Sequence, residues 1–125
     1  MLIMVDVPAQ EVAYQIIAAV EGGSGYWCQG FQLLDSVAKP LESPWYACPF
    51  FWGTEGYRIQ VTYDNPGEGP ETASKVITEV DVSEGLRIMA AKYGRHFGDM
   101  LADNSDAETG DVLLQCIVFS EVIFG

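Results

Sequence analysis

Apolar and polar side chains follow a helical period near the start of the chain. The apolar residues of this stretch are Val12, Ala13, Ile16, Ile17, Ala19 and Val20. Their spacing places them on one face of a helix. Pro8 precedes the segment, where its fixed φ suits a helix start, and Gly22-Gly23 follows it as a C-terminal cap. The pattern predicts a helix over residues 9–21, after a short apolar run at 2–5 that favours an edge strand.

The middle of the chain has the period of β-strands. Residues 57–63 alternate apolar and polar side chains, which is typical of a strand with one buried face. Residues 75–80 predict a second strand, and the loop 64–74, rich in turn-forming residues, joins the two as an antiparallel pair. In the irregular stretch before them, 31–34 and 49–52 are candidates for short strands.

Two further helices are predicted in the last third of the chain. Asp81 and Glu84 have the spacing of a capping box, and apolar residues at helical spacing continue to Leu101. Ser105 and Glu108 have the spacing of a second capping box, which opens the C-terminal helix.

The C-terminal helix is apolar nearly all the way round. Its apolar residues are Val112, Leu113, Leu114, Cys116, Ile117, Val118, Phe119, Val122, Ile123 and Phe124. Only Gln115, Ser120 and Glu121 interrupt them. A helix that is apolar on every side must be covered on every side. We therefore expect a homo-oligomer through this helix, and the alternative is a buried central helix within one monomer.

The order of these elements predicts the fold class. It indicates an α+β fold in which an N-terminal helix and two C-terminal helices pack on an antiparallel sheet. The 125 residues, at 13.7 kDa, are typical of one domain spanning residues 1–125. A chain of this length can bury a core without disulfides or a metal.

The charge of the chain restricts its partners. Eighteen acidic and six basic residues give a formal net charge of −12 and a pI near 4.1. Such a field repels nucleic acid and anionic lipid and attracts basic surfaces. We expect no direct nucleic-acid or membrane contact and a partner protein with a basic surface. An acidic surface that serves only solubility is the alternative.

Sequence features also indicate a cytoplasmic location. No apolar run reaches the roughly 20 residues of a membrane span, and the first residues lack the basic segment of a signal peptide. Cys28, Cys48 and Cys116 are widely spaced, as expected of reduced thiols rather than a disulfide framework.

Acidic residues gather at the junction of the last two helices and are the candidate partner-binding residues. They are Asp99, Asp103, Asp106, Glu108 and Asp111. Their spacing does not match the ligand positions of an EF-hand loop. Negative charge in the first turns of a helix is also favoured by the helix dipole, so local helix chemistry is the alternative reading.

Aromatic residues crowd the region between the first helix and the alternating strand. A hydrophobic core for a small sheet is one interpretation. The other is a stacking surface for a nucleotide, with a nearby arginine to contact phosphate. The candidate ligand-binding residues in that case are Tyr26, Trp27, Trp45, Tyr46, Trp52 and Arg58.

Nothing in the sequence indicates an enzyme, a cofactor or a metal site. His96 is the only histidine and has no nucleophile at a recognisable spacing. The three cysteines and His96 lack the close pairs of zinc ligands. No phosphate-binding glycine loop, nucleophile elbow or metalloprotease motif occurs.

Four stretches at the two ends of the chain carry a resemblance to known proteins: residues 20–27, 95–101, 106–115 and 121–125. They are similar to a family of small acidic proteins that recurs in phage and prophage genomes, although Phe124 replaces the family's usual tyrosine. The family has no established activity, so the resemblance transfers no functional residues.

The resemblance implies an intracellular accessory protein of a phage or mobile element, and such proteins often counter host defence. Our first hypothesis is an anti-CRISPR-like inhibitor that binds a basic, nucleic-acid-binding surface of a host immune complex. The alternative is a homo-oligomeric sponge that holds a nucleotide messenger between aromatic residues.

Overall fold

Three strands form one antiparallel sheet in the computed structural model, which describes residues 4–40 and 43–125. The strands lie in chain order and are β1 (Cys28–Asp35), β2 (Arg58–Asp64) and β3 (Thr72–Ile77). β2 has the predicted alternation, since Ile59 and Val61 are buried whereas Arg58 is exposed. On β3, Ile77 is buried as well, whereas Thr72, Ser74 and Val76 are exposed on the opposite face.

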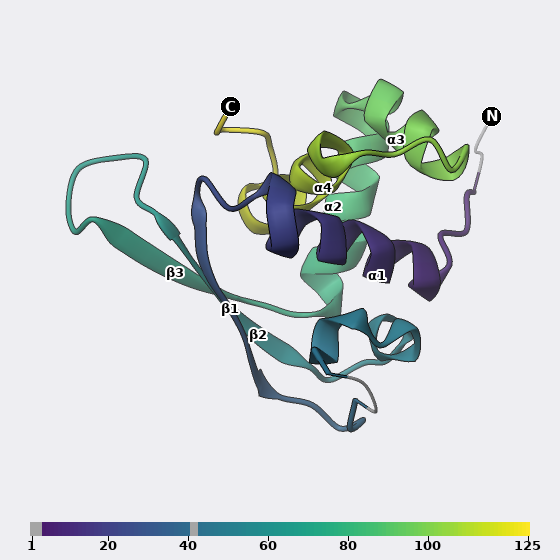
Figure 1. The fold of residues 1–125 in the computed structure, drawn as a ribbon, viewed down its shortest axis with the longest axis horizontal. Helices are drawn as coiled ribbons and strands as arrows, with labels where there is room; N and C mark the ends of the chain where they lie inside the picture. Colours follow the sequence, from purple (N-terminus) through teal and green to yellow (C-terminus); the bar gives the residue numbers. More distant parts are fainter. Residues whose placement is uncertain (1–3, 41–42) are drawn as a thin grey trace.

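The helices gather on one side of the sheet, and the β2–β3 hairpin extends beyond them (Figure 1). They are α1 (Ala9–Ala18), α2 (Glu79–Lys92), α3 (Gly94–Leu101) and α4 (Ala107–Phe119), and a π-helical turn, Ala19–Gly23, continues α1. The predicted α+β fold, with an N-terminal helix and C-terminal helices on an antiparallel sheet, is confirmed. Within the described ranges, no helix is long and apolar enough to cross a membrane.

One predicted strand is wrong. Residues 49–52 belong to a 3-10 helix, Pro49–Gly53, which follows a 3-10 turn at Trp45–Ala47. Phe51 and Trp52 are both buried, whereas neighbouring residues of a strand would point to opposite faces. The strand predicted at 2–5 falls partly on residues 1–3, outside the described residues, and residues 4–8 form no strand.

The helix boundaries also differ from the prediction. α2 is capped by Thr78, whose amide donates to Asp81 Oδ2 at 2.9 Å, so Asp81 lies inside the helix. The helix predicted to continue to Leu101 is interrupted at Tyr93, where φ is −127° and ψ is 50°. The Tyr93 hydroxyl accepts a hydrogen bond from the Val122 amide at 2.8 Å, which ties this interruption to the C-terminal tail.

α4 lies at the centre of the helical layer. Asp106, rather than Ser105, caps it, and it ends before Ser120, which has a left-handed φ of 63°. Every residue from 109 to 118 is buried within the single chain, where α4 contacts α1, α2, α3 and β3. The chain itself therefore covers the apolar helix, and the reason for expecting a partner subunit on it does not hold.

Two glycines allow this close packing. A Cβ on Gly85 of α2 would lie 2.5 Å from Ile117 Cγ1, and one on Gly110 of α4 would lie 2.7 Å from the carbonyl oxygen of Gln15. No other residue type fits these positions without a shift of the neighbouring helix.

Candidate functional site

The carboxylate of Asp111 is buried and accepts hydrogen bonds from four side chains. Its Oδ1 accepts from Ser24 Oγ at 2.8 Å and from Trp27 Nε1 at 2.7 Å. Its Oδ2 accepts from the Tyr26 hydroxyl at 2.7 Å and from Gln115 Nε2 at 3.1 Å. Asp111 is 7% exposed, so it lacks the exposure that the predicted partner-binding role requires. Instead it fastens the segment before β1 to α4.

Gln115 extends this network to the C-terminal tail. Its Oε1 accepts from the amides of Ile123 and Phe124, both at 2.9 Å, and its Nε2 lies 3.2 Å from the Phe124 carbonyl. The Phe124 ring stacks on Trp27 with a centroid distance of 5.5 Å and an interplanar angle of 3°. The tail is thus held by both polar and aromatic contacts.

A hollow of about 500 Å³ lies beside this network, and Tyr26, Glu108 and Asp111 line it together with tail residues. Partial burial, and then the hydrogen bond to Asp111, raises the pKa of Tyr26 to about 12, so its hydroxyl stays protonated and donates at neutral pH. The ionisable side chains that line the hollow are acidic or phenolic, and none is basic. Such a lining does not suit a phosphate group.

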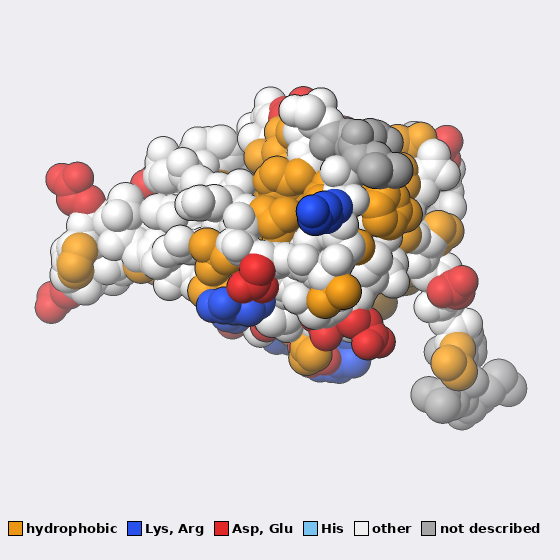
Figure 2. Space-filling model, turned by 90° about the horizontal axis from the view of Figure 1, so that it is seen from below, with side chains coloured by type: hydrophobic (Ala, Val, Ile, Leu, Met, Phe, Trp, Pro, Cys, Tyr) orange, Lys and Arg blue, Asp and Glu red, His pale blue; other side chains and the backbone are white. Residues whose placement is uncertain are grey.

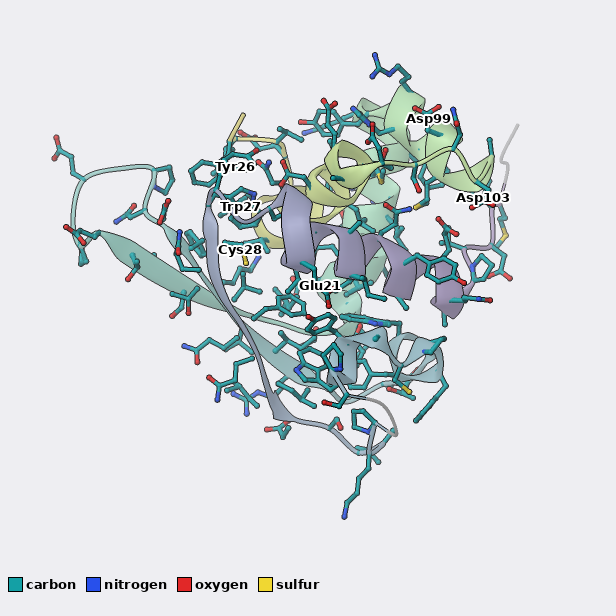
Figure 3. All side chains as sticks on the ribbon, viewed as in Figure 1. Glu21, Tyr26, Trp27, Cys28, Asp99 and Asp103 are labelled. Atoms are coloured by element: carbon teal, nitrogen blue, oxygen red, sulfur yellow. The ribbon has the colours of Figure 1, made fainter. Side chains whose placement is uncertain are left out.

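The predicted acidic residues divide between different surroundings. Figure 3 shows Asp99 and Asp103 at α3, far from Tyr26 and Trp27 at the start of β1. Asp103, Asp106 and Glu108 are exposed at the turn between α3 and α4, whereas Asp99 is half-buried. We call the three exposed residues Asp103, Asp106 and Glu108 the acidic turn.

Two residues of the acidic turn make local side-chain contacts, and the third has an unusual backbone conformation. Asp106 caps α4 by accepting from the Thr109 amide at 3.0 Å, and this hydrogen bond is the main reason why the pKa of Asp106 is lowered. Glu108 Oε1 lies 3.8 Å from His96 Nε2. Asp103 has a left-handed φ of 57°. Local helix chemistry, the alternative reading of these acids, therefore explains the position of Asp106 in part.

Little positive charge offsets the acidic turn. No lysine, arginine or histidine follows His96 in the sequence. Elsewhere, Arg58 pairs with Asp35 at 2.9 Å, Arg87 pairs with Glu84, and Lys75 lies 3.9 Å from Asp81. The basic residues of these pairs are already neutralised by carboxylates.

The candidate nucleotide-binding aromatic residues do not form one surface. Tyr26 and Trp27 belong to the Asp111 network. Trp45, Tyr46 and Trp52 form a separate cluster under the sheet with Phe31, Phe51 and Tyr57, in which Trp45 stacks on Phe31 at 5.4 Å. The interpretation as a hydrophobic core is thus confirmed for this cluster.

The charges around the aromatic residues also disagree with a nucleotide site. The Tyr46 hydroxyl donates to Glu21 Oε2 at 2.7 Å, and partial burial with this bond raises the pKa of Tyr46 to about 12. Arg58 contacts Asp35 rather than an aromatic ring. Figure 2 shows hydrophobic side chains gathered around one basic side chain on the face seen from below, with acidic side chains beneath them and at both ends.

Tyr57 is a buried residue for which the alternating pattern of residues 57–63 predicted no function, only the first position of a strand. It is 1% exposed, and its ring lies 4.8 Å from that of Phe51 and 5.7 Å from that of Trp52. Its hydroxyl has no hydrogen-bond partner among residues 4–40 and 43–125. Burial, and then the charges of Glu79 and Asp81, raises its pKa above the ordinary range.

Tyr57 lines a hollow of about 280 Å³ between the 3-10 helix and the start of α2. Trp52, Glu55 and Glu79 line it as well. A neighbouring hollow of about 360 Å³ shares Val7, Ser83 and Leu86 with the first, so the two form one groove along α2. We call it the α2 groove. No sequence motif marks it, because its walls come from three separate segments.

The three thiols lie in surroundings typical of structural cysteines. Cys48 and Cys116 are buried and Cys28 is half-buried, and burial raises the pKa of Cys28 and of Cys116 to about 11. In the part of the chain that the structure describes, no three His, Cys, Asp or Glu side chains are arranged to hold a metal ion.

Known proteins do not identify this site. No protein-family model, curated protein or solved structure matches the chain. The resemblance to a phage protein family therefore stays a prediction from the sequence, and any function has to be argued from the acidic turn, the Asp111 network and the α2 groove.

Proposed function

We propose that the protein is a non-enzymatic, phage-encoded inhibitor that binds a basic, nucleic-acid-binding surface of a host immune complex. It acts in the cytoplasm of the host cell and uses no cofactor. The acidic turn is the observation that carries this proposal, because three exposed carboxylates lie within six consecutive positions, 103–108.

The composition of the acidic turn favours a protein partner over a solely solubilising role. Net charge spread over a surface serves solubility. A local group of carboxylates with no lysine or arginine in the same stretch of sequence concentrates the negative field at one place. A basic surface that ordinarily binds phosphates is complementary to such a group, and association driven in this way weakens as salt screens the charges.

The nucleotide-messenger alternative is less well supported. Its aromatic residues divide into two clusters, and a carboxylate accepts a hydrogen bond from a tyrosine in each of them. A bound phosphate would have to lie near Asp111 or Glu21, which costs electrostatic energy.

A charge-neutralised variant tests the proposal. The combined substitution Asp103→Asn, Asp106→Asn and Glu108→Gln removes the charge of the acidic turn. Asparagine is tolerated at a left-handed position and at a helix N-cap, so the fold should survive. Glu68→Gln combined with Glu71→Gln, in the exposed β2–β3 loop, is the control.

The measurement is recovery of a nucleic-acid-binding protein from defence-carrying host cells by the tagged chain, over a series of salt concentrations. We expect recovery of the partner to fall as the salt concentration rises and as competing nucleic acid is added. The acidic-turn variant should fail to recover the partner, whereas the loop variant should recover it as the wild type does. Recovery that is insensitive to salt, or equal for both variants, would contradict the proposal.

A further inference from the structure

We propose that the α2 groove binds an arginine or lysine side chain, presented by a segment of the partner protein in which an apolar residue follows. This inference rests on the proposed function, since it names what part of a basic partner the protein recognises. It concerns residues outside the acidic turn and the Asp111 network.

The unpartnered hydroxyl of Tyr57 is the first observation. A buried hydroxyl without a hydrogen bond is unfavourable, and native proteins rarely keep one. Tyr57 and Glu79 line the same hollow at the start of α2, and the charges of Glu79 and Asp81 add to the effect of burial in raising the pKa of Tyr57. The hydroxyl oxygen has almost no accessible surface although Tyr57 lines the hollow, so a group that enters the groove can pair with it only after a small shift of the surrounding side chains.

The acidic residues that line the first hollow favour a cationic group as its ligand. Glu55 and Glu79 line the same hollow as Tyr57, and no basic side chain lines it. A guanidinium or ammonium group donates hydrogen bonds, and the two carboxylates and the phenol oxygen can all accept them. Trp52 and Tyr57 add aromatic surface, which attracts cations.

The second hollow indicates that the basic side chain belongs to a polypeptide rather than to a free small molecule. It continues from the first past Val7 and Leu86 and is lined mainly by apolar residues. Phe97 lies at its far part, and its one basic lining residue, Arg87, is paired with Glu84. Figure 1 shows the 3-10 helices beneath α1 and beside the start of α2, so the carboxylate end of the groove lies there. A segment with a basic residue followed by an apolar one matches the order of the two hollows.

The groove can be tested with small probes. The probe is N-acetyl-arginyl-leucine amide, and its neutral isostere is N-acetyl-citrullinyl-leucine amide. Amide shifts of residues 53–56 and the Trp52 indole signal would be followed by NMR during titration. We expect a saturable change confined to the groove for the arginine probe, and affinity weaker by about tenfold or more for the citrulline probe.

Variants of the groove separate binding from folding. Tyr57→Phe keeps the ring and removes the unpaired hydroxyl, so the unliganded protein should be as stable as the wild type or more stable, while the arginine probe binds more weakly. Glu79→Gln should weaken binding as well. Glu68→Gln, which removes the same charge from the distant loop, should not.

Several results would overturn the proposal. They are equal binding of the citrulline probe, no saturable change, and a Tyr57→Phe variant that binds the arginine probe as the wild type does. Tighter binding of putrescine than of the arginine probe would assign the groove to a free amine instead. The acidic-turn variant should still bind the probe. Recovery of the partner that is equal for the acidic-turn variant and the loop variant, with probe binding retained, would refute the proposed function alone.

Discussion

Trp27 and Asp111 lie 84 positions apart in the chain, and the indole Nε1 donates to the carboxylate Oδ1 at 2.7 Å. This bond joins the segment before β1 to the central helix. Hydrogen bonds to a buried charged group are stronger than those between neutral groups, and breaking them leaves buried donors unpaired.

Substitution of Asp111 should therefore destabilise the fold strongly. In Asp111→Asn an amide group faces side chains that themselves donate, so we expect a loss of about 3 kcal/mol in the free energy of unfolding, measured by urea denaturation. Asp103→Asn makes the same chemical change at an exposed position and should alter stability by less than about 0.5 kcal/mol. Equal urea midpoints for the two variants would show that the network does not stabilise the protein.

Gln115→Glu should produce a destabilisation that depends on pH. The substituted side chain would place a second carboxylate beside Asp111, since Gln115 Nε2 lies 3.1 Å from Asp111 Oδ2. Two adjacent carboxylates repel, and the pKa of one is raised. Stability relative to the wild type should recover as pH falls from about 7 to about 5, where the second carboxylate binds a proton. A stability difference that is the same at both pH values would contradict this expectation.

Alkaline pH should destabilise the protein through thiols and phenols whose pKa is higher in the folded chain. The pKa of Cys28 and of Cys116 is raised from 9.0 to about 11, and that of Tyr26 and of Tyr46 from 10.0 to about 12. Between the unfolded and folded values the unfolded chain has lost protons that the folded chain keeps, so rising pH favours unfolding. Their contribution is complete below the unfolded values and disappears as pH rises through the folded ones.

The urea midpoint should accordingly fall as pH rises from 9 toward 12. Tyrosinate absorbance measured with and without urea supplies the second measurement, because ionisation should occur at higher pH in the folded protein. Identical ionisation curves in the two states would contradict the linkage.

Glycine substitutions should separate close packing from helix propensity. Gly85→Ala places a methyl group 2.5 Å from Ile117 Cγ1 and 2.9 Å from its backbone nitrogen, so we expect a loss of about 3 kcal/mol in the free energy of unfolding. Gly98→Ala has no neighbour within 4 Å and should raise stability by about 0.5 to 1 kcal/mol. Thermal unfolding of the two variants and the wild type supplies the measurement. An unfolding temperature that rises in both variants would contradict the prediction, because it would mean that α2 moves away from α4 to make room for the methyl group.

The local patterns of the sequence correctly predicted much of the fold. The alternation in 57–63 predicted β2, and the helical spacing after Pro8 predicted α1, because the side-chain periods of strands and helices are properties of the local backbone. The aromatic stretch misled the prediction, since proline-rich turns let the neighbours Phe51 and Trp52 enter the core together.

The candidate site was only partly predictable. The acidic turn could be predicted from the sequence, because its carboxylates are close together along the chain. The burial of Asp111 could not, since a carboxylate in the first turns of a helix is ordinarily exposed and favoured by the helix dipole. Its donors come from a segment far away in the chain, and only the folded protein brings them together.

By itself the sequence determined α1, β2, the antiparallel β2–β3 pairing, the net charge of −12 and the position of the acidic turn. The tertiary structure alone decided that α4 is covered within one chain, that Asp111 is a buried acceptor and that Tyr57 and Glu79 line the same α2 groove. The physical reason is the range of the forces involved. Backbone periodicity acts over a few residues, whereas burial and hydrogen-bond satisfaction depend on which distant segments pack against each other.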